Sequence, residues 1–126
     1  MPSSNDNTYL LGIDGGTESL RAGIFDLDGA LLASASTAYQ THFPNPGWSE
    51  QDPLDWWRAL GQSVRTVVDQ ASLRPEQIAA MAVDTTCCSV VALDEDGFPL
   101  RPCLIWMDVR SAAQTEKVVA TADDAL

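Results

Sequence analysis

Three apolar segments near the N-terminus, separated by two tight turns, constrain the fold of this chain most. They are residues 9–13, 20–27 and 30–39, and each has the length and composition of a β-strand. Asp28-Gly29 separates the second segment from the third, and this dipeptide is a strong signal for a hairpin turn. The segments therefore predict an antiparallel meander. Such an opening differs from a dinucleotide-binding βαβ unit, in which a helix follows the first strand.

Helical and extended segments follow the meander. A helix is predicted to begin at Pro53, after an N-cap at Asp52, and to extend to about residue 72 along one apolar stripe. Pro75 starts a short helix, and residues 78–83 read as a further strand. Strands and helices in this order predict an α/β layer rather than a sandwich or a bundle.

The C-terminal third continues the alternation. Asp96-Gly97 predicts a second hairpin, within residues 89–100. Residues 103–108 are an apolar run that ends on an aspartate, and an alanine-rich helix is expected from Ser111.

Charge and cysteine usage exclude several classes of function. The formal net charge is −11, from 18 acidic and 7 basic residues, which argues against a nucleic-acid partner or an anionic membrane surface. Cys87, Cys88 and Cys103 have no CxxC spacing and His42 is the lone histidine, so neither a zinc site nor a disulfide framework is expected. With no secretory signal or spanning segment visible, a cytoplasmic protein is the default.

The first turn carries chemistry that a plain turn does not need. Asp14 ends the first strand, and Gly15, Gly16 and Thr17 follow it. Glycines let a backbone approach a phosphate closely, threonine adds a hydroxyl donor, and an aspartate can hold hydrated Mg²⁺. The alternative is an ordinary β-turn in which the aspartate caps glycine amides. The two common phosphate-loop fingerprints, GxGxxG and GxxxxGK[ST], are absent from the chain.

Four segments occur in a characteristic order: DGGT at 14–17, PGWSEQDP at 46–53, MAVDTTCCSVVALDEDG at 81–97 and LIWMDVRS at 104–111. Together they resemble the N-terminal part of the first domain of the FGGY carbohydrate kinases, which belong to the actin-like ATP-binding superfamily. The resemblance covers roughly residues 9–117.

Two of these segments also suggest a branch of the family. VDTTC and WMDVR look most like the ribulokinase and D-ribulokinase branch. Glycerol kinases instead carry an Arg-Glu pair, which falls at Thr86-Cys87 here.

The resemblance implies a fold and a domain organisation. It implies an actin-like, ribonuclease H-like α/β domain that is truncated and opens with the three-stranded meander. Residues 1–8 would be a disordered lead, and residues 9–126 a partial kinase domain. The implied activity is ATP- and Mg²⁺-dependent phosphorylation of a small-molecule sugar, a pentulose such as ribulose or xylulose, with a homodimer left open.

The resemblance also assigns roles to residues of the site. Asp14 would face the metal, through water, and Gly15, Gly16 and Thr17 would face the ATP phosphates. Six further side chains match segments that touch the sugar: Thr86, Cys87, Cys88, Trp106, Asp108 and Arg110. Without the resemblance, the tryptophan would read as core, the Asp-Arg pair as surface, and the threonine-cysteine segment as a plain strand exit. The acidic and polar groups of residues 48–52 read as helix-start chemistry with a structural role.

The implied catalytic base, an aspartate, would lie beyond Leu126. The chain is therefore expected to be an N-terminal fragment that is inactive alone. One alternative is a non-catalytic module that binds a sugar or a partner. Another is a ribonuclease H-like nuclease with Asp14 and Asp84 in a metal cluster, which the net charge of −11 disfavours.

Overall fold

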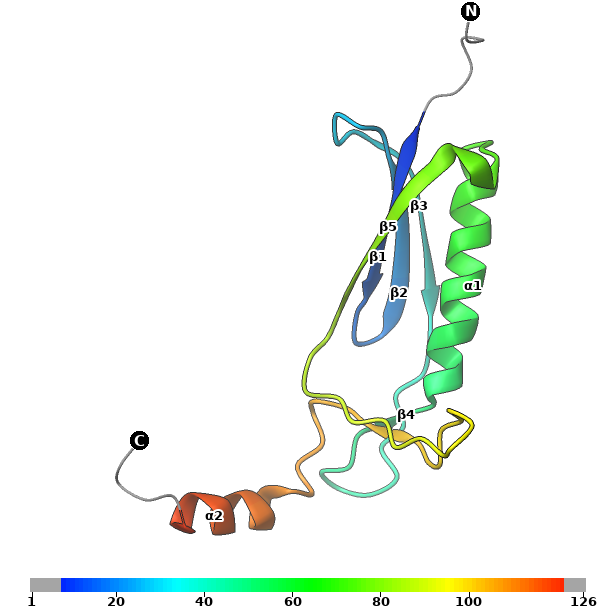
Figure 1. Ribbon diagram of the computed structural model, residues 1–126. Helices are drawn as coiled ribbons and strands as arrows, with labels where there is room; N and C mark the ends of the chain where they lie inside the picture. Colours follow the sequence, from blue (N-terminus) through cyan, green and yellow to red (C-terminus); the bar gives the residue numbers. More distant parts are fainter. Residues whose placement is uncertain (1–7, 122–126) are drawn as a thin grey trace, which may run out of the picture. The chain divides into compact units, whose positions relative to one another are not determined.

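The computed structural model describes residues 8–121 and contains a four-stranded sheet. β1 (Tyr9–Gly15), β2 (Ser19–Phe25) and β3 (Leu31–Ala38) form the antiparallel meander that the turn signals predict. β5 (Ile78–Thr85) lies parallel to β1, so the strand order is β3-β2-β1-β5 (Figure 1). The predicted lead, residues 1–8, falls almost entirely outside the described residues.

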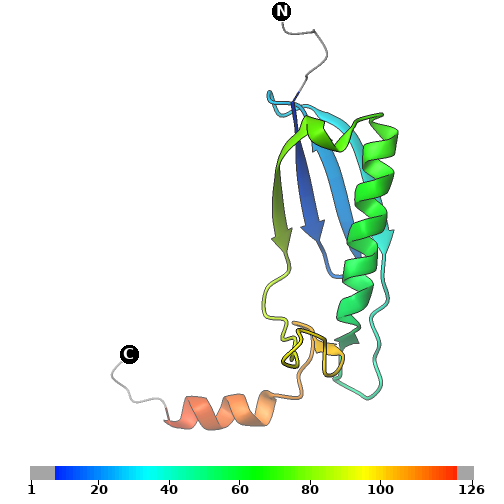
Figure 2. The same ribbon diagram turned by 45° about the vertical axis from the view of Figure 1, so that its right-hand side comes forward.

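Helix α1 (Pro53–Gln70) covers one face of this sheet (Figure 2). Its buried side chains are Ala59, Ser63 and Val67, four residues apart, as expected for an amphipathic helix. The Ser63 hydroxyl donates a 2.8 Å hydrogen bond to Oγ1 of Thr37, so its burial is satisfied. Among residues 8–121, the core between helix and sheet contains seven buried hydrophobic residues: Leu11, Ile13, Leu20, Ala22, Ile24, Ala59 and Val67.

Shorter elements complete the described chain. A 3₁₀ turn, η1 (Pro75–Gln77), precedes β5. β4 (Glu50–Gln51) pairs antiparallel with β6 (Cys103–Leu104), and helix α2 (Ala112–Thr121) follows. None of the helices among residues 8–121 has both the length and the apolar character that a membrane span requires.

The chain divides into two compact units. The sheet unit comprises residues 1–40 and 53–87 in so far as they are described, and the loop unit the described part of residues 41–52 and 88–126. Each unit is considered by itself below.

The second predicted hairpin is present in a short form, with its turn and one bridged pair but without longer strands. Gly97 has the positive φ (+83°) expected of the turn, and a bridge joins Leu93 to Pro99. Within the turn, the Asp94 carboxylate accepts hydrogen bonds from the amides of Asp96 and Phe98. Two backbone hydrogen bonds cross the hairpin, from the Asp94 amide to the Phe98 carbonyl and from the Leu100 amide to the Ala92 carbonyl, both at 2.9 Å. The pairing does not extend further, because Val90 pairs with Leu104 instead.

Candidate functional site

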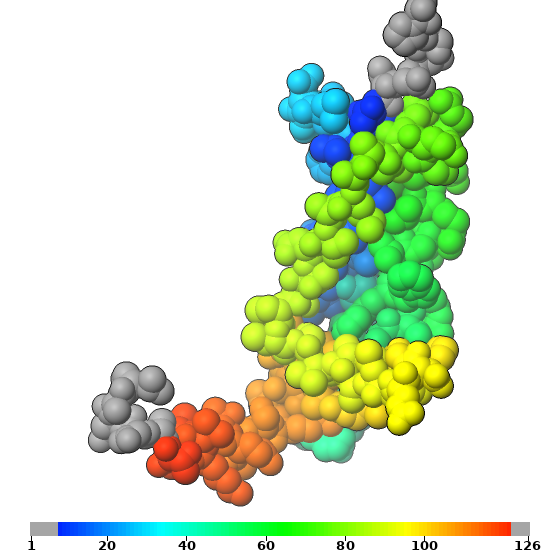
Figure 3. Space-filling model, viewed as in Figure 1, coloured from blue at the N-terminus to red at the C-terminus, as the bar shows by residue number. Residues whose placement is uncertain are grey.

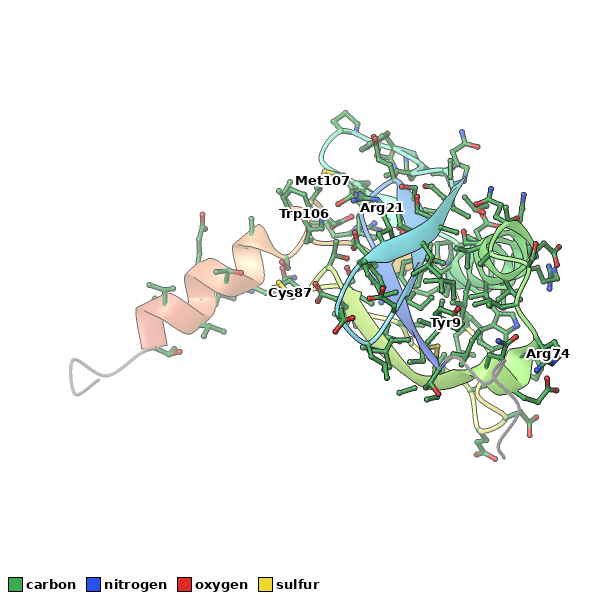
Figure 4. All side chains as sticks on the ribbon, turned by 90° about the horizontal axis from the view of Figure 1, so that it is seen from above. Tyr9, Arg21, Arg74, Cys87, Trp106 and Met107 are labelled. Atoms are coloured by element: carbon green, nitrogen blue, oxygen red, sulfur yellow. The ribbon has the colours of Figure 1, made fainter. Side chains whose placement is uncertain are left out.

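The turn between β1 and β2 carries an ion pair that spans the two strands. Asp14 in β1 lies opposite Arg21 in β2, and Nη1 of the arginine is 3.0 Å from Oδ2 of the aspartate. Both side chains are about half exposed, and Arg21 is labelled in Figure 4. The positively charged side chain of Arg21 is therefore held beside the DGGT turn, where it is accessible to solvent.

The two glycines of the turn are favoured by close neighbours rather than by unusual backbone angles, because neither has a positive φ. A Cβ at Gly16 would lie 3.2 Å from Nη2 of Arg21 and 3.3 Å from the carbonyl oxygen of Ser19, and one at Gly15 would lie 3.2 Å from Cγ2 of Thr85. The Gly16 amide donates a 3.0 Å hydrogen bond to the Ser19 carbonyl. This amide is thus used within the turn, and phosphate binding by Gly16 stays a prediction that rests on close approach.

Tyr39 supports the turn from the end of β3. Its hydroxyl donates a hydrogen bond to the Gly16 carbonyl. Burial, and secondarily the negative charge of Asp14, raise the pKa of Tyr39 above its ordinary value. The phenol therefore keeps its proton and stays a donor at neutral pH.

The parallel pairing of β1 with β5 brings two strand ends together. Asp14 is in register with Asp84, and the Thr86 amide donates a 3.1 Å hydrogen bond to the Gly15 carbonyl. Thr86 and Cys87, both exposed, follow directly. The sheet unit thus collects the predicted phosphate-binding residues and two of the predicted sugar-binding ones at one end of its sheet.

In the loop unit, the carboxylate of Asp108 lies at the centre of a compact charged cluster. Its Oδ2 accepts a 2.8 Å hydrogen bond from the Ser49 amide and one of 2.6 Å from Nη2 of Arg110. Its Oδ1 accepts hydrogen bonds from Nε and from the backbone amide of Arg110, at 2.9 and 3.0 Å. Only 5% of the Asp108 side chain is exposed. The carboxylate is therefore occupied by contacts within the unit.

Arg110 joins this carboxylate to a second one. Its Nη2 lies 2.8 Å from Oε1 of Glu50, and its guanidinium carbon lies 3.9 Å from the centroid of the Trp48 ring. The hydrogen bonds from Arg110 hold the pKa of Asp108 far below its usual range, and the bonds to Asp108 and Glu50 raise the pKa of Arg110 further. Asp108 and Arg110 are therefore both ionised over the physiological pH range.

The remaining predicted sugar-binding residues also belong to the loop unit. Trp106 lies in the turn between β6 and α2, next to Met107, and 54% of its surface is exposed (Figure 4). This contrasts with the reading of that tryptophan as core. Cys88 opens the unit with a positive φ of 57°.

Residues 9–124 match the sequence profile of the FGGY family of carbohydrate kinases, N-terminal domain. The chain belongs to the FGGY family of carbohydrate kinases. The prediction made from its four motifs is thereby confirmed, as is the actin-like α/β fold.

Several FGGY kinases resemble this chain over most of its length. It is 34% identical over 110 residues to a glycerol kinase of Thermococcus onnurineus and 39% identical over 107 residues to one of Roseobacter denitrificans. These matches cover 87% and 84% of the chain but only 22% of each relative. The crystal structure of xylulose kinase from Rhodospirillum rubrum superposes with a TM-score of 0.84 at 28% identity, over 91% of this chain and 24% of that one. These names do not favour the ribulokinase branch, which stays a prediction.

The structure adds three residues that the motifs of this FGGY-family chain did not single out as functional: Arg21, Trp48 and Glu50. Arg21 is a charged side chain within an apolar strand and lies opposite Asp14 once the hairpin register is known, so the sequence contained a signal. Glu50 was read as part of a helix start, and its partner Arg110 lies 60 residues away. No local pattern links those two.

Proposed function

We propose that this chain supplies part of the site for ATP-dependent phosphorylation of a sugar hydroxyl, with a pentulose such as ribulose or xylulose as substrate. The observation that carries the proposal is the β1–β2 turn, where the ion pair of Asp14 and Arg21 lies beside two glycines whose neighbours leave little room for a Cβ. In the reaction, a sugar oxygen bonds to the γ-phosphorus of ATP, and the bond from that phosphorus to the bridging oxygen of ADP breaks. The sugar proton passes to a base, which we expect beyond Leu126.

The turn suits the charge that phosphoryl transfer develops. Catalysis of this reaction depends mainly on positioning and on electrostatic stabilisation of the phosphoryl oxygens. The Arg21 guanidinium supplies positive charge, the Thr17 hydroxyl a donor, and Gly15 and Gly16 room for close approach of a phosphate.

Asp14 fits a hydrated Mg²⁺. Its Oδ2 pairs with Arg21, whereas its Oδ1 has no hydrogen bond or ion pair to another residue of the described part of the chain. Residues 8–121 contain no group of three or more His, Cys, Asp or Glu side chains placed to hold a metal. One carboxylate is still enough, because Mg²⁺ usually keeps several waters and takes its other ligands from phosphates. When bound with ATP, the ion would neutralise phosphate charge.

The residues predicted from the family stay the candidates for sugar contact, Thr86 and Cys87 in the sheet unit and Cys88, Trp106 and Arg110 in the loop unit. Asp108, whose carboxylate is occupied by Ser49 and Arg110, would act by holding Arg110. Trp106 offers an exposed indole face suited to the C–H face of a sugar. Thr86 and Cys87 stand where glycerol kinases carry an Arg-Glu pair, which favours a pentulose over glycerol. Glycerol stays the alternative substrate, because the relatives at 34–39% identity are glycerol kinases.

The activity belongs to the whole protein in this proposal. The chain spans 22% of the length of the glycerol kinases that it matches, and we expect it to be inactive alone. We place the kinase in the cytoplasm, with the sugar as its small-molecule partner. The second candidate, a binding module without catalysis, predicts sugar-dependent thermal stabilisation without ATP hydrolysis.

Measurement of ADP release by the native gene product tests the proposal. D-ribulose, L-ribulose, D-xylulose, glycerol and gluconate should be compared with ATP and Mg²⁺ present. We expect the highest kcat/KM with a ketopentose. A preference for glycerol would overturn the substrate assignment, and no ADP release with any of them would overturn the kinase proposal.

The role of Arg21 has its own matched test. Arg21→Met should raise KM for ATP about tenfold, as expected for loss of one charged hydrogen bond to a phosphate. Arg58→Met is the control, because Arg58 pairs with Asp55 on α1. Because exposed ion pairs contribute at most about 1 kcal/mol, both variants should fold. Equal KM values for ATP in the two variants would show that Arg21 does not contact the ATP phosphates.

A further inference from the structure

Two segments of the loop unit are joined by a continuous set of hydrogen bonds. The Val109 amide donates to the Gly47 carbonyl at 3.0 Å, and the Ile105 amide to the Ser49 carbonyl at 3.2 Å. The Ser49 amide donates in return to the Asp108 carboxylate at 2.8 Å. Residues 47–50 therefore support residues 105–110, the segment to which the proposed function assigns sugar contacts.

Glu50 completes this support through Arg110. Only 18% of the Glu50 side chain and 25% of the Arg110 side chain are exposed, so the pair is better shielded from water than a surface salt bridge. Asp108 and Glu50 hold Nε and Nη2 of the guanidinium, and the Trp48 ring packs against its face. The guanidinium is therefore restrained on two edges and one face.

The third nitrogen of Arg110 is the one left for a ligand. Nη1 makes no hydrogen bond to another residue within 8–121, although the group carries two N–H donors. The two carboxylates outnumber the one guanidinium, so the cluster carries a formal charge of −1. Such a group donates well to a neutral hydroxyl and repels an added anion.

We propose that Glu50 is a positioning residue that holds Arg110 with Nη1 directed to a neutral polyhydroxylated substrate, and that its charge makes this subsite discriminate against anionic sugars. The inference rests on the proposed function, because it names the substrate class of the same site. It departs from the reading of Glu50 as part of a helix start.

Substitution of Glu50 separates its charge from its shape. Glu50→Gln keeps an acceptor oxygen but removes the charge. We expect KM for the preferred neutral sugar to rise about three- to tenfold with kcat nearly unchanged, because ground-state positioning is loosened. The ratio of kcat/KM for gluconate to that for the neutral sugar should rise at the same time. Glu116→Gln, which removes an equal charge from exposed α2, should change neither value.

A double-mutant cycle shows whether Glu50 acts through Arg110. Arg110→Met should raise KM by at least as much as Glu50→Gln, and adding Glu50→Gln to Arg110→Met should raise it no further. Additive effects, an unchanged KM in Arg110→Met, or an unchanged substrate ratio in Glu50→Gln would each overturn the proposal.

A spectroscopic measurement tests the restraint without any activity. In ¹⁵N-edited NMR of the chain, the Nη2–H protons of Arg110, which Glu50 and Asp108 hold, should exchange slowly with water in the parent and about tenfold faster in Glu50→Gln. Glu116→Gln should leave this exchange rate unchanged. Equal exchange rates in the parent and Glu50→Gln would overturn the positioning role. Failure of the kinase assay, in contrast, would reject the proposed function and leave this measurement interpretable.

Discussion

At the scale of single residues, Asp108 makes the stability of the loop unit depend on pH. Its carboxylate is ionised and hydrogen-bonded in the folded chain, where its pKa lies well below the ordinary 3.8, chiefly because of Arg110. In the unfolded chain these partners are lost and the pKa returns to its ordinary range. The stabilisation from this group is thus fully present above about pH 5 and is lost as the pH falls below 3.8 towards the lower folded value.

A charge-neutral variant tests this dependence. Relative to the parent, Asp108→Asn should lower the urea midpoint at pH 7, and the difference should shrink steadily between about pH 5 and pH 2. Asp96→Asn, in the exposed turn of the same unit, removes an equal charge and should leave the urea midpoint close to that of the parent. A difference between parent and Asp108→Asn that is constant with pH would contradict the linkage.

At the scale of elements, the contact between residues 47–50 and 105–110 depends on one glycine. Gly47 has φ of +78°, and a Cβ there would lie 2.8 Å from Cγ2 of Val109. A side chain at this position is therefore opposed both by the backbone angle and by the neighbouring segment.

We expect Gly47→Ala to destabilise the chain more than Gly97→Ala does. Gly97 has a similar φ of +83°, but a Cβ there would meet no atom within 4 Å, so its substitution isolates the backbone cost of about 1–2 kcal/mol. The clash with Val109 should add about 1 kcal/mol or more at Gly47. Chemical denaturation of both variants measures the difference, and Val109→Ala added to Gly47→Ala should recover the added part. Equal losses of stability in the two single variants would mean that the close approach of Gly47 to Val109 does not affect the stability of the chain.

At the scale of the whole molecule, β5 presents an apolar surface. Met81 and Val83 lie two residues apart on one face of the strand and are 59% and 58% exposed. Figure 3 shows β5 along the viewed side of the sheet unit, beside α1. Within residues 8–121, β5 pairs with β1 alone, so its other edge is open. Open apolar edge strands promote association between chains.

Self-association should therefore rise with concentration and depend on β5. In sedimentation velocity experiments on the 126-residue chain, Val83→Lys should shift the distribution towards monomer. Val118→Lys, on exposed α2, adds the same charge elsewhere and should have little effect. If only Val118→Lys reduced association, α2 rather than β5 would be the contacting surface, and a parent chain that stays monomeric would contradict the prediction altogether.

Local physical chemistry was enough to predict much of this protein. Turn chemistry at Asp28-Gly29 and strand composition predicted the meander, and the proline start and apolar stripe predicted α1, because these signals act between residues close in sequence. Four short motifs in order were enough for the family. The hairpin expected at 89–100 formed its turn and one bridged pair but not longer strands, because Val90 pairs with Leu104 of another segment.

The partners of the charged residues were decided only by tertiary structure. Arg21 faces Asp14 because of the hairpin register, and Arg110 meets Glu50 across 60 residues because β4 pairs with β6. Whether a carboxylate caps a helix, holds an arginine or faces a ligand depends on which groups folding brings within about 3 Å. A charged residue carries no sign of its distant partner in its own sequence neighbourhood, so its role becomes visible only when the chain is folded.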